Sequence, residues 1–177
     1  MTLAAQRSIL LLVDLQGRLI PAIAEAETLL ANVRRLGEAA RLLDVPVLAT
    51  EQNPQGLGST IADLAALPAR TFSKRFFDAT REASVAAALP PERPTVVVAG
   101  CEAHVCVLQT TLGLLRLGRR VVLVADAVGS RILANLNAAL ARAKAHGAEI
   151  VTTEMVIFEW LETSDHPRFR EVLRLVK

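Results

Sequence analysis

The sequence predicts a three-layer α/β/α sandwich built on a mainly parallel, six-stranded sheet. Short apolar runs rich in β-branched residues alternate along the chain with longer segments of helical periodicity. This alternation is typical of a parallel sheet that is covered by helices on both faces. The length of 177 residues fits a single domain over 1–177, which is large enough to bury a core without disulfides or metal ions.

The first part of the chain predicts two strands around one long helix. An apolar run that ends in Asp14 predicts a buried strand over 8–14. Apolar residues at helical spacing then predict a helix over 27–43. A short strand is expected over 45–50, and the proline and glycines within 51–60 indicate a loop.

The middle of the chain continues the same order of elements. A short third strand is predicted over 70–73, and a short helix over 81–89 that two prolines end. The run of valines over 95–99 predicts the fourth strand. A helix follows over 104–117, so this strand turns directly into a helix.

The last part of the chain adds two strands and further helices. A glycine after 117 ends the preceding helix, and an apolar run over 121–125 predicts the fifth strand. A helix over 131–146 and a strand over 149–152 complete the sheet. The tail over 154–177 has helical character, interrupted by a turn at 164–167.

The composition excludes several classes of protein. The net charge of +2 comes from scattered residues of both signs, with no basic block, so binding to nucleic acid or to an anionic membrane is not expected. No apolar span reaches 18 residues and no signal peptide precedes the first strand. Cys101 and Cys106 are five residues apart across a tight strand-to-helix junction, a geometry that disfavours a disulfide between them. A cytoplasmic location is therefore predicted.

Three ionisable residues stand at or just after the carboxyl ends of predicted strands. They are Asp14, Lys74 and Cys106, and ligands of open α/β sheets bind at this edge. Taken singly, each has an ordinary structural explanation. Together they could supply a general base, a cation and a nucleophile. A thiol near the start of a helix is also expected to favour the thiolate.

Four motifs in order along the chain resemble the isochorismatase-like cysteine hydrolase superfamily, which includes nicotinamidases and N-carbamoylsarcosine amidohydrolases. They are Leu11–Gln16, Lys74–Ala79, Gly100–Val107 and Val124–Arg131. The stretch Thr50–Gly58 is similar to that of a subgroup of uncharacterised hydrolases. The resemblance implies a Rossmann-like fold, homo-oligomers, and hydrolysis of a C–N bond in a small amide, ureido or imide compound.

The resemblance also implies a role for each of the three residues. Asp14 is the general base, Cys106 the nucleophile that forms an acyl-enzyme, and Lys74 the cation that holds both anionic groups. A non-proline cis peptide is implied at Cys101–Glu102. The backbone N–H groups of Glu102 and Cys106 are then the implied oxyanion hole.

Residues near the predicted sheet edge are candidates for the substrate pocket: Gln16, Glu51, Gln52 and Phe77. No cofactor and no metal are expected, because the three histidines are scattered and none belongs to an Asp-x-His after the second strand. The role of His104 stays open. Two alternatives to a hydrolase also stay open, a non-catalytic scaffold or binding protein and a flavodoxin-like nucleotide binder, although the chain has no phosphate-loop motif.

Overall fold

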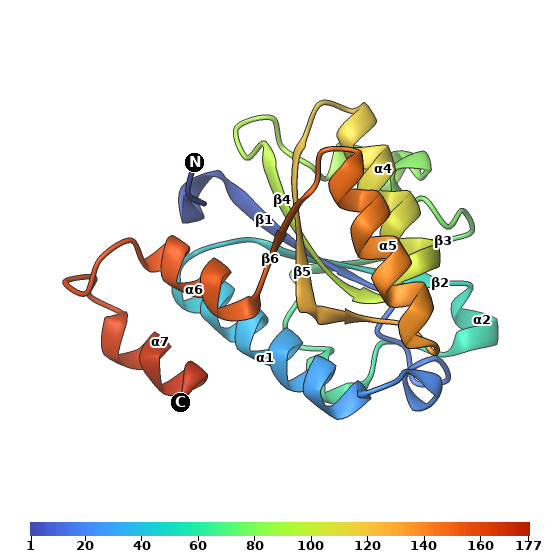
Figure 1. Ribbon diagram of the computed structural model, residues 1–177, viewed down its shortest axis with the longest axis horizontal. Helices are drawn as coiled ribbons and strands as arrows, with labels where there is room; N and C mark the ends of the chain where they lie inside the picture. The colour runs from blue at the N-terminus through green and yellow to red at the C-terminus, as the bar shows by residue number, and fades with distance from the viewer.

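A computed structural model describes residues 1–177, which form a six-stranded sheet in the order β3-β2-β1-β4-β5-β6 (Figure 1). All five strand pairs are parallel. The strands are β1 (Ser8–Val13), β2 (Val47–Gln52), β3 (Arg70–Lys74), β4 (Thr95–Cys101), β5 (Arg120–Gly129) and β6 (Glu149–Val151). The helices are α1 (Ala26–Leu42), α2 (Pro54–Leu57), α3 (Ala83–Ala87), α4 (Leu108–Arg116), α5 (Leu133–Ala145), α6 (Thr153–Leu161) and α7 (Phe169–Val176). The predicted α/β fold class is confirmed.

Helices cover both faces of the sheet, which makes the fold three-layered. Helices α1, α6 and α7 lie on one side, and α4 and α5 on the other (Figure 1). The buried side chains accordingly form two clusters, one on each face. None of the helices combines the length and apolar character needed to cross a membrane.

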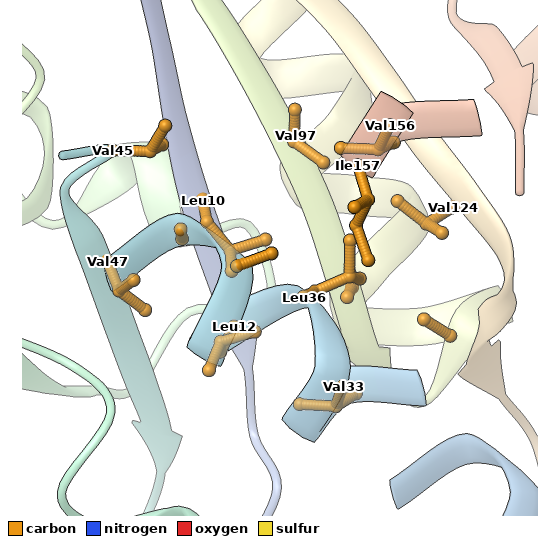
Figure 2. Close-up of a cluster of buried hydrophobic side chains, with 14 of the residues drawn as sticks. Leu10, Leu12, Val33, Leu36, Val45, Val47, Val97, Val124, Val156 and Ile157 are labelled. Atoms are coloured by element: carbon orange, nitrogen blue, oxygen red, sulfur yellow. The ribbon is translucent and has the colours of Figure 1, made fainter. Parts of the chain in front are cut away.

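Strand β1 shows how the sequence builds both layers at once. All six of its residues are buried, and successive side chains point to opposite faces because a strand has a period of two. Leu10 and Leu12 therefore pack in the cluster that α1 and α6 cover (Figure 2). Ile9 and Leu11 pack in the opposite cluster. This explains why the strand appears in the sequence as an uninterrupted apolar run.

The loop predicted over 51–60 contains the end of β2 and the short helix α2 (Pro54–Leu57). Two further elements differ from the predicted ones. The single helix expected over 104–117 begins as a π-helix over Ala103–Val107 and becomes α-helical only from Leu108. Strand β5 is longer than expected, because after a register shift in β4 its end pairs Val128 with Gly100 and Gly129 with Cys101. Both differences lie next to the end of β4.

The strand order reverses its direction between β1 and β4. From β1 the chain builds β2 and β3 to one side, and β4 to β6 follow on the other. In open α/β sheets the crevice at such a reversal, beyond the carboxyl ends of the strands, is where ligands bind. The residues that follow β1 and β4 are Asp14 and Glu102.

Candidate active site

Asp14 is held in a fixed position directly after β1. Its backbone adopts φ of 52°, a left-handed conformation in which Asp is tolerated better than most residues. Its N–H donates to the Thr50 carbonyl of β2 at 3.0 Å, and its Oδ1 accepts from Thr50 Oγ1 at 2.7 Å. The side chain is fully buried. An ionised carboxylate in such a place requires a partner.

Lys74, the last residue of β3, is that partner. Its Nζ lies 2.8 Å from Asp14 Oδ2, and neither side chain has any exposed surface. The ammonium also donates to Gln52 Oε1 at 2.7 Å and to the Phe76 carbonyl at 3.4 Å. Gln52 is oriented in turn, since its Nε2 donates to the Arg75 carbonyl at 2.8 Å. The buried pair is therefore built from the ends of two strands that are not neighbours.

Cys106 lies in the π-helical turn after β4 and is 6% exposed. Its Sγ is 4.0 Å from Gln52 Oε1. Burial and, to a smaller extent, the negative charge of Asp14 raise the pKa of the thiol, Lys74 opposes both, and the result is a pKa of about 12. The expectation that the helix start favours a thiolate is therefore wrong for the free protein, because desolvation outweighs the nearby cation.

The turn between β4 and this π-helix brings a backbone donor to the site. The peptide bond between Cys101 and Glu102 is cis. The N–H of Glu102 makes no hydrogen bond within the chain. The Glu102 carboxylate is held by Arg131, with Oε2 accepting from Arg131 Nε at 3.0 Å and from the Arg131 N–H at 3.1 Å. The turn therefore leaves one N–H group available to a ligand.

Before this turn β4 runs against β1 so closely that a side chain would not fit. Gly100 has φ of 122°, and a Cβ built on it would lie 2.1 Å from the Val13 carbonyl oxygen. Only glycine satisfies both the conformation and the contact. The glycine in the nucleophile motif is therefore required by the backbone geometry.

A cavity of about 350 Å³ opens beside these groups. Its walls combine apolar side chains with a few polar ones, as is usual for small-molecule sites. The lining residues are Asp14, Arg18, Leu19, Ala22, Gln52, Leu57, Phe77, Glu102, Val105, Cys106 and Arg131. Lys74 lies behind Asp14 rather than in the wall. The structure thus brings Asp14, Lys74 and Cys106 together at one site.

Two of the four residues expected to border the pocket do so, Gln52 and Phe77. Gln16 does not, since it is fully buried and fixes the loops by donating to the carbonyls of Gln52 and Gly58 and accepting from the Gln52 N–H. Glu51 does not either, because its Oε1 accepts from the N–H and Oγ1 of Thr60. Both residues hold the loops that surround the cavity, which corrects their assignment.

Several cavity residues were not predicted from the sequence. Arg18, Leu19 and Ala22 come from the loop after β1, Leu57 from α2, and Val105 and Arg131 from the segments after β4 and β5. Arg131 closes one of the four family-like motifs, which was a usable signal. Nothing in the local sequence marks Arg18, because its place in the wall depends on how the loop folds back.

The remaining candidates have structural partners. The ring nitrogens of His104 contact residues other than Cys106, with Nδ1 3.0 Å from Ser130 Oγ and Nε2 3.4 Å from Asn135 Nδ2. Cys101 is fully buried in the core beside β1, and burial raises the pKa of its thiol. No three His, Cys, Asp or Glu side chains are grouped so as to hold a metal ion.

Comparison with known proteins finds relatives that match almost the whole chain. Residues 8–155 match the model of the Isochorismatase domain family. Isochorismatase domain-containing protein 2A of Mus musculus is 37% identical over 97% of this chain and 84% of its own length. A structure described as MAR1 ribonuclease from Caenorhabditis elegans is 35% identical, with a TM-score of 0.90 over 99% of this chain and 92% of its own.

A more distant solved structure agrees in fold. The YcaC gene product of Escherichia coli, described as an octameric hydrolase of unknown specificity, is 22% identical. It superposes with a TM-score of 0.84 over 98% of this chain and 95% of its own.

Proposed function

This chain belongs to the isochorismatase domain family, and from that premise we propose that it is a cysteine hydrolase that cleaves a C–N bond in a small amide, ureido or imide compound. The observation that supports this most is the ion pair of Lys74 Nζ and Asp14 Oδ2, 2.8 Å apart and fully buried, beside the Cys106 thiol. Replacing a buried ion pair by apolar residues is often neutral or stabilising. Its presence next to a nucleophile therefore favours a chemical role over a structural one.

The reaction begins with a protonated thiol, because burial raises the pKa of Cys106 to about 12. As the substrate carbonyl binds, Asp14 accepts the Sγ proton, and the sulfur electron pair forms a bond to the carbonyl carbon. Lys74 lowers the pKa of the thiol through its positive charge. It therefore stabilises the thiolate at the moment when the proton leaves.

The carbonyl oxygen becomes an oxyanion that needs hydrogen-bond donors. We assign this role to the backbone N–H groups of Glu102 and Cys106. The Glu102 N–H has no partner in the chain, and both residues line the cavity. A single preorganised donor of this kind contributes about 2.7–4 kcal/mol to transition-state stabilisation.

The second half of the reaction returns the enzyme to its starting state. Asp14 gives its proton to the substrate nitrogen, the C–N bond breaks, and an amine or ammonia leaves a thioester on Cys106. Asp14 then takes a proton from water, whose oxygen attacks the thioester carbon. The C–S bond breaks and the sulfur takes the proton back from Asp14, releasing the acid. These steps use only residues of this chain, and no cofactor is expected.

Turnover of a panel of small primary amides, ureido acids and cyclic imides tests the proposal, with ammonia or amine release as the readout. We expect Cys106→Ala to lower the rate by at least about 1,000-fold, as the loss of a nucleophile does in other hydrolases. Cys101→Ala is the matched control, because that thiol is fully buried outside the cavity. Unchanged turnover in Cys106→Ala would overturn the proposal. No turnover of any compound by the wild type would favour the non-catalytic scaffold instead.

Ribonuclease activity is a second candidate, because the 35% identical Caenorhabditis elegans structure is described as a ribonuclease. Two arginines in the cavity wall, Arg18 and Arg131, are the residue type that binds phosphate. Cleavage of a labelled RNA by the wild type but not by Cys106→Ala would favour this candidate. Intact RNA would support the prediction that nucleic acid is not a partner.

We also propose that the chain forms a homo-oligomer in the cytoplasm. Several large apolar side chains are exposed near the cavity or on the segment after β5: Phe76, Phe77, Ile132 and Leu133. Exposed apolar groups of this size are typical of protein interfaces, and the distant Escherichia coli structure is an octamer. Light scattering in solution gives the number of subunits directly.

A further inference from the structure

Five charged side chains meet at the cavity. Asp14, Glu102, Arg18 and Arg131 line it, and Lys74 lies behind Asp14. Lys74 pairs with Asp14 at 2.8 Å, and Arg131 pairs with Glu102 at 3.0 Å. Arg18 forms no ion pair, so three cations and two anions leave one positive charge at the site. A ligand with one negative charge would balance it.

The two arginine side chains also have N–H donors that make no hydrogen bond within the chain. Arg18 uses only Nη1, which donates to the Gly56 carbonyl at 2.9 Å. This bond holds the guanidinium near α2 and leaves Nη2 and Nε without acceptors in the chain. Arg131 uses its Nε on Glu102, which leaves both of its terminal nitrogens without acceptors. Paired guanidinium N–H groups match the two oxygens of a carboxylate.

The rest of the cavity wall indicates the chemical character of the ligand segment between the anionic group and the scissile bond. The wall is apolar over Leu19, Ala22, Leu57, Phe77 and Val105. A volume of about 350 Å³ suits a small compound with a short apolar stem. We propose that Arg18 and Arg131 form an anion subsite, and that the substrate carries a carboxylate a short stem away from its scissile C–N bond. This rests on the proposed function in one respect, that the cavity is the substrate site.

Two alkylating reagents test the subsite without any known substrate. Iodoacetate and iodoacetamide have nearly the same size and react alike, since the thiolate sulfur forms a bond to the CH₂ carbon and iodide leaves. They differ in charge. The ratio of their rate constants at Cys106, measured by peptide mass spectrometry and divided by the ratio for glutathione, reports the local preference for an anion.

We expect this normalised ratio to fall about 3- to 10-fold in Arg18→Gln, the size expected for one charge a few ångströms away in a largely aqueous site. Arg18→Lys keeps the charge and should keep the ratio. Arg170→Gln is the matched control, because Arg170 is exposed on α7 and does not line the cavity. Added salt should reduce the wild-type preference. Equal ratios in wild type and Arg18→Gln, or an equal fall in Arg170→Gln, would overturn the subsite.

Hydrolysis separates this inference from the proposed function. Succinamate and succinamide have the same shape and differ only in a carboxylate against a second amide. Preference of the wild type for succinamate, lost in Arg18→Gln, would support the subsite. Hydrolysis of amides without such a preference would overturn the subsite and leave the hydrolase standing. An alkylation ratio that depends on Arg18 without turnover of any amide would support the subsite and reject the hydrolase.

Discussion

Replacing Lys74 by methionine tests how strongly the buried ion pair depends on both partners. The change keeps most of the aliphatic stem and removes the ammonium. Asp14 then keeps the Thr50 hydroxyl at 2.7 Å but loses the cation at 2.8 Å, in a place where neither side chain is exposed. Removing one partner of a buried pair costs about 3–5 kcal/mol. Since 1 kcal/mol corresponds to about 2–4 °C in a domain of this size, Tm should fall by about 6–20 °C.

A double-mutant cycle in urea measures the coupling directly. Asp14→Asn leaves Lys74 unpaired, whereas the double variant leaves no charge. The double variant should therefore lose less free energy of unfolding than the two single variants together, by at least about 1 kcal/mol. Arg34→Met is the control, because the Arg34–Asp63 pair is nearly as close, at 3.0 Å against 2.8 Å, but its side chains are 45% and 72% exposed. This exposed pair should contribute less than about 1 kcal/mol.

Two results would refute this reasoning about the ion pair. One is additivity of Lys74→Met and Asp14→Asn within about 0.5 kcal/mol, which is the behaviour of independent sites. The other is a loss in Lys74→Met no larger than that in Arg34→Met. Either result would mean that burial does not make the pair at the site different from a pair in solvent.

Three further predictions follow from the geometry around the pair. The rate constant for alkylation of Cys106 by iodoacetamide should rise about tenfold per pH unit between about pH 7 and 10. The reason is that only the thiolate reacts, and burial raises the pKa of this thiol to about 12. A plateau of the rate constant near neutral pH would contradict this. Gln52→Leu removes the acceptor 2.7 Å from Lys74 Nζ and should lower the free energy of unfolding in urea by about 1.5–3 kcal/mol, whereas unchanged stability would mean that this bond contributes nothing. Gly100→Ala places a Cβ 2.1 Å from the Val13 carbonyl oxygen at φ of 122°. The free energy of unfolding should fall by more than the roughly 1–2 kcal/mol that the backbone conformation alone costs. An unchanged Tm would show that β1 and β4 can move apart.

The fold was predictable because the central strands β1 and β4 have a distinctive local pattern. Continuous apolar runs marked strands that are buried on both faces, such as β1. Their alternation with helical segments then restricted the topology to a parallel sheet. The π-helix over Ala103–Val107 was not predictable, because its residues have the same apolar pattern as an α-helix. The extension of β5 depends on pairing with β4 after a register shift, which the sequence of β5 alone does not reveal.

Only the site residues that lie at the ends of strands could be predicted from the sequence. Asp14 and Lys74 could be placed at one sheet edge, since parallel strands end on the same side. The protonation state of Cys106 could not, because it depends on how far the surrounding loops exclude water. Loop packing also determines that Gln16 holds two loops together through hydrogen bonds and that Arg18 lines the cavity. Contacts between loops distant in sequence leave no local signal.

Detection of an acyl group on Cys106 tests most directly whether this thiol is the nucleophile. The wild type, Asp14→Asn and Cys101→Ala are mixed with p-nitrophenyl acetate, quenched in acid within the first turnover, and mapped by peptide mass spectrometry. We expect the acetyl group on the Cys106 peptide in the wild type and in Cys101→Ala, and a much lower amount in Asp14→Asn, because the thiol then has no base. An acetyl group on Cys101 instead, or equal labelling of Cys106 in Asp14→Asn, would contradict the assignment of Cys106 and Asp14 as nucleophile and base.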